Sequence, residues 1–363
     1  MSAEARRRSL NDGHARRRPR PCGLTVHTCV GCPFACTYCY IDDLGFPRGK
    51  AQPYSLSGEE WLLAIASNPF FLPGPHGTYL SFGSVCEPLY GPCLNVTLSY
   101  LSKVRDHLSN PCQISTKASL GDEEVERLAR SLPRLINVLV TIITLNRSHE
   151  LEPKAPSPQE RLETLKRLRS KGIPSFLFLR PLLPGLESEV DDLLSEAKQA
   201  GAVGVVIGGL RLSQKIYDRL KLLKIDVPRP RGRLVDVPQP GLKKLVIEAA
   251  KEKSLPVFRS ACCATTFSIT LLTGVNVPCA GLCFTSRLCT GCSVGCVKAL
   301  PAVSEEEIAE STLLALGSKP RSVKSLGSYV EIELEPERSP RRGGVELLQL
   351  ILRRRVRLFR PQP

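Results

Sequence analysis

Short apolar segments alternate with longer amphipathic segments from about residue 23 to about residue 207. The apolar segments have the length and composition of buried strands, and the amphipathic segments repeat their apolar residues with the period of a helix. This alternation predicts a parallel sheet whose outer face is covered by helices. The predicted strands are residues 23–28, 78–83, 112–116, 135–144, 176–179 and 203–207, and the predicted helices are residues 57–67, 94–108, 122–132, 157–171 and 190–200.

About six strand–helix units predict an α/β fold, a partial (β/α)6 barrel of the TIM type. Ser57 and Ser157 each stand three residues before a glutamate, which is the pattern of a capping box at the start of a helix. In such barrels the reacting groups lie at the carboxyl ends of the strands. We therefore expect the functional residues in the loops that follow the strands.

The pattern changes after about residue 213. Residues 226–240 are rich in proline and arginine and predict an extended connector. Beyond it we expect helices at 242–253 and 304–316, a strand at 329–335, and either a strand or a helix at 345–352. The predicted parts of the chain are a basic disordered tail (1–20), the barrel (21–215), a connector with a cysteine-rich auxiliary metal region (216–300), and a small C-terminal appendage with a basic tail (301–363).

The composition fits a protein of this kind. At 363 residues and 42% hydrophobic content, the chain is long enough for one large α/β domain and a smaller appendage. No apolar run reaches membrane-spanning length, and residues 1–20 lack the apolar core of a signal peptide. We therefore expect a cytoplasmic protein without a membrane partner. In that compartment, fifteen cysteines favour metal and redox chemistry over disulfides.

The net charge of +15 raises the question of a nucleic-acid partner. Most of this charge lies at the two ends of the chain. Residues 1–20 hold seven arginines and two acidic residues, and residues 338–363 hold eight arginines and one glutamate, so the rest of the chain carries only +3. Basic ends can guide a nucleic-acid substrate or simply attract any polyanion, because charge alone reads no sequence.

Three cysteines, Cys32, Cys36 and Cys39, fall within eight positions. Thiolates at this spacing can surround one soft centre, either zinc or an iron–sulfur cluster, because a short loop can turn each sulfur inward. Three protein ligands leave one metal position open, where a substrate or cofactor can bind. The alternatives are a zinc loop and chance spacing in a cysteine-rich chain.

A second group of cysteines follows near residue 290, within a glycine-rich stretch. An auxiliary iron–sulfur cluster is our first interpretation, structural zinc the second, and free thiols on a loop the third. The residues of this group are Cys279, Cys283, Cys289, Cys292 and Cys296.

The first cysteine group, Cys32-x-x-x-Cys36-x-Tyr38-Cys39, resembles the cluster loop of the radical SAM superfamily. The resemblance implies a 4Fe-4S cluster on the three cysteines, with S-adenosylmethionine (SAM) bound to the fourth iron and near Tyr38. It also implies reductive cleavage of SAM to a 5'-deoxyadenosyl radical that abstracts hydrogen from a substrate. A one-electron reductant such as ferredoxin or flavodoxin would be the partner.

Residues 29–211 further resemble the spore photoproduct lyase and DNA repair photolyase branch of that superfamily. The similarity of Phe82-Gly83-Ser84-Val85-Cys86-Glu87-Pro88 implies that Gly83 and Ser84 hold the amino group of SAM. The similarity of Thr116-Lys117 implies that Lys117 binds the carboxylate of SAM. Thr141 to Thr144, followed by Glu152-Pro153 and Arg161, completes the pattern, with Thr141 and Arg161 on the cofactor. As alternatives, Lys117 and Arg161 are ordinary surface charges and Thr141 is a strand former.

The chain also departs from the lyase pattern. Where the lyase carries a cysteine that returns a hydrogen atom to its product, this chain has Ser84, and Cys86 stands two residues later. Cys86 shares a face with Ser84 on a strand, whereas a turn would redirect it. We expect a radical SAM enzyme with Cys86 as its catalytic thiol, acting on an unidentified substrate, with DNA or RNA as one candidate. The alternative is a noncatalytic iron–sulfur or zinc protein that binds nucleic acid.

Overall fold

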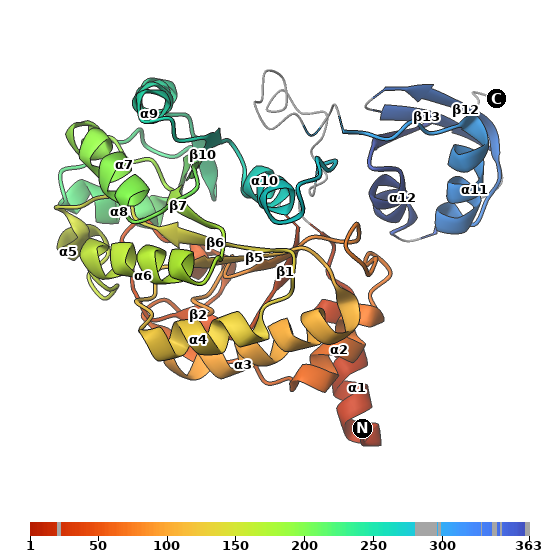
Figure 1. The fold of residues 1–363 in the computed structure, drawn as a ribbon, viewed down its shortest axis with the longest axis horizontal. Helices are drawn as coiled ribbons and strands as arrows, with labels where there is room; N and C mark the ends of the chain where they lie inside the picture. Colours follow the sequence, from red (N-terminus) through yellow and green to blue (C-terminus); the bar gives the residue numbers. More distant parts are fainter. Residues whose placement is uncertain are drawn as a thin grey trace.

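A computed structural model of the chain describes residues 1–19, 23–279, 296, 299–327, 329–335, 340–341 and 343–359. Its centre is a sheet of seven parallel strands that follow one another in chain order (Figure 1). The predicted partial barrel is therefore confirmed. The strands, in the order of the sheet, are β1 (Leu24–Val26), β4 (Leu80–Phe82), β5 (Cys112–Thr116), β6 (Ile136–Thr141), β7 (Ser175–Leu179), β8 (Val205–Ile207) and β11 (Val257–Phe258).

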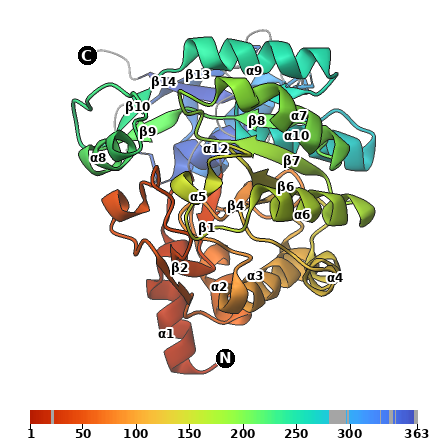
Figure 2. The same cartoon turned by 90° about the vertical axis from the view of Figure 1, so that its left-hand side faces the viewer.

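Helices cover the outer face of the sheet (Figures 1 and 2). They are α2 (Gly58–Ala66), α3 (Gly91–Lys103), α4 (Asp122–Ser131), α6 (Pro158–Ser170), α7 (Val190–Gln199) and α9 (Pro240–Glu252). The short helix α5 (Ser148–Leu151) lies in the loop after β6, and α10 (Ala261–Thr273) packs on the opposite face of the sheet, where Ala264 joins Leu139 and Phe176. The capping boxes at Ser57 and Ser157 are both present. Each serine hydroxyl accepts from the backbone amide of the glutamate three residues later, and the carboxylate of that glutamate accepts from the serine amide. Local sequence thus sets where α2 and α6 begin.

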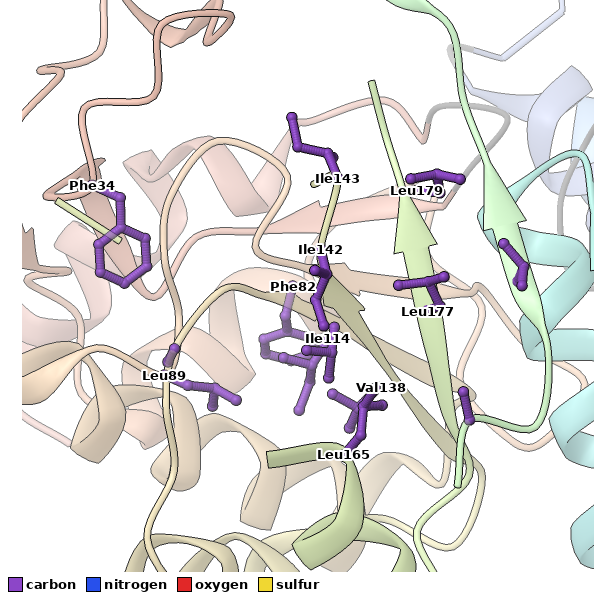
Figure 3. Close-up of a cluster of buried hydrophobic side chains, with 14 of the residues drawn as sticks. Phe34, Phe82, Leu89, Ile114, Val138, Ile142, Ile143, Leu165, Leu177 and Leu179 are labelled. Carbon is purple, nitrogen blue, oxygen red and sulfur yellow. The ribbon is translucent and has the colours of Figure 1, made fainter. Parts of the chain in front are cut away.

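The core lies between the sheet and these helices. Figure 3 shows Phe82, Ile114 and Val138, from three neighbouring strands, with Leu165 of α6 beside Val138, and all four side chains are almost completely buried. Burying a side chain of this size stabilises the fold by about 1.5–3 kcal/mol. This packing holds the carboxyl ends of the strands in a fixed arrangement, which is where the loops of interest begin.

The sheet extends beyond the predicted barrel boundary at residue 215. Strand β11 pairs with β8 in parallel, and α9 and α10 flank it, so the strand–helix pattern continues to about residue 273. The predicted connector is also more ordered than we expected. Strand β10 (Val235–Val237) pairs with β9 (Leu210–Leu212), and helix α8 (Gln214–Leu222) lies between them in the chain.

The first 19 residues differ from the predicted disordered tail. They form α1 (Ala3–Asn11) and the 3-10 turn η1 (Gly13–Ala15), which pack against the barrel. The imidazole of His14 is buried, with Nδ1 2.7 Å from Asp12 Oδ1 and Nε2 accepting from the His27 amide at 2.9 Å. The arginines suggested a solvated tail, but this buried histidine holds the segment in place.

The C-terminal residues form a small unit with its own apolar core. A sheet of β12 (Pro320–Leu326), β13 (Tyr329–Leu334) and β14 (Arg355–Phe359) packs with helices α11 (Glu305–Leu316) and α12 (Gly344–Leu352). The open choice at 345–352 is therefore a helix, and part of the predicted basic tail is strand β14. No helix in the described part of the chain is long and apolar enough to cross a membrane.

Candidate functional site

The three early cysteines lie on a loop that is closed at its base. Strand β2 (Cys29–Cys32) pairs antiparallel with β3 (Lys50–Pro53), and the Gly49 amide donates to the Cys32 carbonyl at 2.8 Å. Strand β2 includes Cys32, so the turn that carries Cys36 and Cys39 begins directly after this cysteine. At Gly31, φ is +82° and a Cβ would stand 2.4 Å from a backbone oxygen, so only glycine fits this closure.

Within the loop, backbone contacts set the positions of Cys36 and Cys39. Ala35 has a left-handed backbone (φ +51°), and the Cys39 amide donates to the Cys36 carbonyl at 3.2 Å. The Thr37 amide donates to the Leu151 carbonyl at 2.9 Å, which ties the loop to α5. Ala35 is not glycine, so its conformation costs about 1–2 kcal/mol and is kept by its surroundings.

The three thiols lie close enough to influence one another. Burial raises the pKa of Cys36 to about 12, and the Lys117 ammonium works against this rise. Burial, with the nearby Glu87 carboxylate, also raises the pKa of Cys32 well above its usual value, and Cys36 adds to the effect. Across the described ranges, no three His, Cys, Asp or Glu side chains converge as ligands of a single metal ion. A 4Fe-4S cluster binds each thiolate at a different iron, so three separate, neighbouring thiols fit it as a donor set.

A buried ion pair stands beside this loop. Arg161 and Glu152 are both fully buried, with Arg161 Nη2 2.6 Å from Glu152 Oε2. Arg161 Nη1 also donates to the Thr141 carbonyl at 2.7 Å, and the Tyr38 hydroxyl donates to Glu152 Oε1. Tyr38 belongs to the cysteine loop, so Glu152 joins that loop to the end of β6 and to α6.

Lys117 completes this group from the end of β5. Its Nζ is 4.0 Å from Glu152 Oε1 and 5.5 Å from the centre of the Tyr38 ring. Burial opposes ionisation of Glu152, but Arg161 and Lys117 together hold the pKa of this carboxyl below its usual value. Burial likewise favours a neutral Lys117, but Cys36 and Glu152 raise its pKa. The site therefore presents a charged ammonium next to the cysteine loop.

The loop after β4 approaches Lys117 from the other side. Glu87 is buried, and its carboxylate accepts from Thr116 Oγ1 at 2.5 Å and from the Lys117 amide at 2.8 Å. Burial raises the pKa of Glu87 in spite of these bonds. We did not single out Glu87 from the sequence. Its only signal was an acidic residue in an otherwise apolar segment after a buried strand.

Gly83 and Ser84 lie at the start of the same loop. Gly83 has φ +85°, and a Cβ there would stand 2.2 Å from the Ser115 carbonyl oxygen, so this close approach to β5 requires glycine. The Ser84 hydroxyl lies 3.2 Å from that of Ser81. The contact with β5 brings this loop next to Lys117.

Cys86 lies in a turn, because β4 ends at Phe82. Of the two alternatives from the sequence, a strand and a turn, the structure has the turn, so Cys86 and Ser84 do not share a strand face. Cys86 is 8% exposed and packs with two fully buried thiols, Cys29 and Cys93. Cys29 Sγ donates to the Glu87 carbonyl at 3.2 Å, so this thiol group adjoins the loop that holds Lys117.

Apart from Gly83, Ser84 and Cys86, which lie on the loop after β4, the predicted site residues fall into three groups. The first comprises Cys32, Cys36, Cys39, Tyr38 and Lys117, which lie close together. The second lies behind it, where Arg161 pairs with Glu152 and donates to the Thr141 carbonyl. In the late cysteine group, Cys279 and Cys296 are buried, and Arg353 Nη1 donates to the Cys279 carbonyl at 3.2 Å. The remaining three, Cys283, Cys289 and Cys292, lie outside the described residues.

Comparisons with known proteins place residues 26–197 under a family model described as the radical SAM superfamily. Uncharacterized protein MJ0683 of Methanocaldococcus jannaschii is 24% identical over 178 residues, which cover 48% of this chain and 65% of the relative. Uncharacterized protein Mb2609c of Mycobacterium bovis is 23% identical over 203 residues, covering 53% and 60%. The chain therefore matches less than two thirds of the length of these curated relatives.

Among solved structures, spore photoproduct lyase complexed with dinucleoside spore photoproduct matches with a TM-score of 0.50 at 15% identity. The match covers 63% of this chain and 73% of the lyase. A variant of that lyase with bound AdoMet and dinucleoside spore photoproduct matches with a TM-score of 0.51 at 14% identity. At such low identity, the likeness establishes a shared fold and leaves the reaction to the site.

Proposed function

The chain belongs to the radical SAM superfamily, and from this premise we propose that it is an enzyme that cleaves SAM reductively at a 4Fe-4S cluster held by Cys32, Cys36 and Cys39. When bound, the cluster would supply the electron that breaks the sulfonium carbon–sulfur bond and yields a 5'-deoxyadenosyl radical. The radical would abstract a hydrogen atom from a substrate.

One observation carries this proposal: the loop with three neighbouring thiols lies directly against a partly buried ammonium, Lys117. Lys117 is the group of this chain that we propose binds the carboxylate of SAM, as a compact cation can. Its side chain stands 4.0 Å from Glu152 and over the Tyr38 ring, while Glu87 holds its backbone amide. These contacts fix the ammonium before any ligand arrives, which lowers the cost of ordering on binding.

The other residues of the site have supporting roles in this proposal. Gly83 lets the loop after β4 approach β5, and we propose that this loop, with Ser84, receives the amino group of SAM. Arg161 acts through Glu152, because its guanidinium is fully buried and already paired, and the Thr141 carbonyl accepts a hydrogen bond from Arg161. We propose Cys86 as the thiol that returns a hydrogen atom to a substrate radical.

DNA or RNA is the substrate class that we propose, with the exact reaction unassigned. The support is the net charge of +15 and the shared fold with a lyase that has been solved with a dinucleoside photoproduct. An ultraviolet-irradiated oligonucleotide, incubated with the reduced enzyme and SAM, tests repair directly. Recovery of thymine would support DNA repair. If no thymine is recovered, repair is excluded and the proposed radical acts on a different substrate.

The test of the main proposal is anaerobic reconstitution with iron and sulfide, followed by dithionite and SAM. We expect 5'-deoxyadenosine from the wild type and none from Cys36→Ala. Cys112→Ala is the matched control, because it removes another buried thiol, in strand β5, that has no role in the site. A wild type that binds iron but forms no 5'-deoxyadenosine would refute the proposal.

A further inference from the structure

A concentration of positive charge lies beside the cysteine loop and plays no part in the site described above. Residues 211–238, which include α8, β10 and all but the first residue of β9, hold eight lysines and arginines against three aspartates, a net charge of +5. The whole stretch from 21 to 337 carries only +3, so this segment is the basic part of the barrel. Figure 2 shows α8, β9 and β10 grouped on one side of the molecule. We call residues 211–238 the basic face.

Contacts place the basic face against the cysteine loop itself. Arg219 Nη2 lies 3.2 Å from the Cys39 carbonyl oxygen and 3.3 Å from Asp42 Oδ2. Arg233 Nη2 donates to the Asp43 carbonyl at 2.9 Å, and the Arg211 guanidinium lies 5.5 Å from the centre of the Tyr40 ring. The face therefore lies next to the backbone of Cys39, one of the three proposed cysteine ligands.

The inner arginines of the face have acidic partners, and the outer ones are exposed. Arg219 pairs with Asp42, and Arg211 Nε lies 3.3 Å from Asp236 Oδ1. Arg229, Arg231 and Arg233 are exposed, and among the ion pairs of the described residues none includes them. The outer part of the face thus offers three unneutralised guanidinium groups to a partner.

The surface between these arginines is mainly apolar, with one carboxylate, that of Asp236. Arg229 and Arg231 line an open cavity of about 770 Å³ together with proline and aliphatic residues, among them Leu212, Pro228 and Val235. Arginine around an apolar centre is typical of protein interfaces, whereas nucleic-acid interfaces are much more polar and charged. The composition therefore favours a protein with an acidic surface over a phosphate backbone.

We propose that the basic face docks an acidic one-electron donor protein of the ferredoxin or flavodoxin kind. This inference rests on the proposed function, because reductive cleavage of SAM requires one electron for each turnover. The donor loses one electron, the 4Fe-4S group proposed for the cysteine loop gains it, and no atom is transferred. Docking here brings the donor next to the loop of Cys36 and Cys39, and opposite charges raise the rate of encounter.

The first experiment measures binding and does not depend on catalysis. The variant Arg229→Glu/Arg231→Glu is compared with the wild type for binding of a flavodoxin and of a 2[4Fe-4S] ferredoxin, by calorimetry at about 20 mM and about 500 mM salt. The matched control, Arg6→Glu/Arg7→Glu, changes the net charge equally at exposed positions elsewhere. We expect binding of at least one donor to weaken tenfold or more in the face variant and at high salt, and less than twofold in the control.

The second experiment separates the donor from the chemistry. With dithionite, the face variant and the wild type should form 5'-deoxyadenosine at the same rate, whereas the protein donor should support the variant at least tenfold more slowly. If dithionite gives no product with the wild type, the proposed function is wrong. The binding experiment still tests whether the basic face docks a donor protein, because it does not depend on catalysis.

Three results would overturn the docking proposal. In the first, neither donor protein binds the wild type at low salt. In the second, the control variant loses as much affinity for the donor as the face variant does. In the third, the face variant binds the donor as tightly as the wild type. A face variant that keeps donor binding but loses affinity for an oligonucleotide would assign the surface to nucleic acid instead.

Discussion

Replacing Arg161 with methionine should destabilise the protein strongly, because it leaves Glu152 buried without its closest partner. The guanidinium and carboxylate are both fully buried and 2.6 Å apart, and Lys117, at 4.0 Å, is the remaining cation beside Glu152. Removing one member of a buried pair typically costs about 3–5 kcal/mol. We expect a loss of that size in the free energy of unfolding of Arg161→Met, measured by urea denaturation at pH 7.

The double variant Arg161→Met/Glu152→Gln should recover part of this loss, because a neutral amide carries no buried charge. The matched control is Arg130→Met, which breaks an ion pair whose arginine is largely exposed and should not change the unfolding midpoint measurably. A loss below about 1 kcal/mol in Arg161→Met, or a double variant less stable than the single one, would refute the role of a buried charge pair.

The pH dependence of this deficit has a definite sign. In the wild type the pKa of Glu152 lies below its usual 4.5, so its ionisation stabilises the fold above about pH 4.5 and less as the pH falls through the lower, folded-state pKa. Without Arg161, burial should raise the pKa above 4.5, and the group then destabilises the fold at neutral pH until it takes up a proton. The difference between variant and wild type should therefore shrink between pH 7 and about pH 4.5. A deficit that stays constant or grows over that range would contradict the assignment.

Three further predictions concern the site. Gly83→Ala should destabilise the fold by more than the about 1–2 kcal/mol that a left-handed alanine costs, because its Cβ would also stand 2.2 Å from a carbonyl oxygen of β5. The control is Gly45→Ala, which has the same φ of +85° but no atom within 4 Å of the added Cβ. In urea denaturation the control should show only the backbone cost. Lys117→Met should raise KM for SAM at least tenfold, about 1.4 kcal/mol, while iron content stays unchanged; equal KM values would exclude the carboxylate contact. The third prediction concerns the iron content per chain after reconstitution, compared between the wild type and Cys36→Ala. About eight irons in the wild type and about four in the variant would establish two clusters. About four irons in the wild type and none in the variant would mean that the late cysteines bind zinc or no metal.

The barrel could be predicted from the sequence because each strand and helix carries a local signal. All six predicted strands are present, since their apolar runs are long enough to recognise. Strand β11 was missed because it has only two residues, Val257 and Phe258, too few for any periodicity. Helix α1 was missed because its arginines suggest a solvated tail. Its contacts with α2, which include Arg8 Nε at 3.0 Å from Glu60, exist only in the folded chain.

The site was partly predictable for the same reason. The cysteine spacing is a local pattern, so Cys32, Cys36 and Cys39 could be recognised from the sequence. The roles of Glu87 and Arg161 depend on partners that lie far from them in the chain, such as Thr116 for Glu87 and Thr141 for Arg161. A charge in a sequence does not show whether it is buried, and burial is what separates these two residues from surface charges.

Two buried carboxylates together decide where the Lys117 ammonium lies. Glu87 accepts from the Lys117 amide and fixes its backbone, while Glu152 attracts its side chain from 4.0 Å. Glu152 also accepts a hydrogen bond from Tyr38, whose loop carries the cysteines. Lys117 and the cysteine loop therefore share Glu152 as a partner. Groups that share a partner respond non-additively to substitution. The distance between the ammonium and the three thiols is therefore set by one connected network, and loss of Glu152 should disturb both ends of a ligand that bridges them.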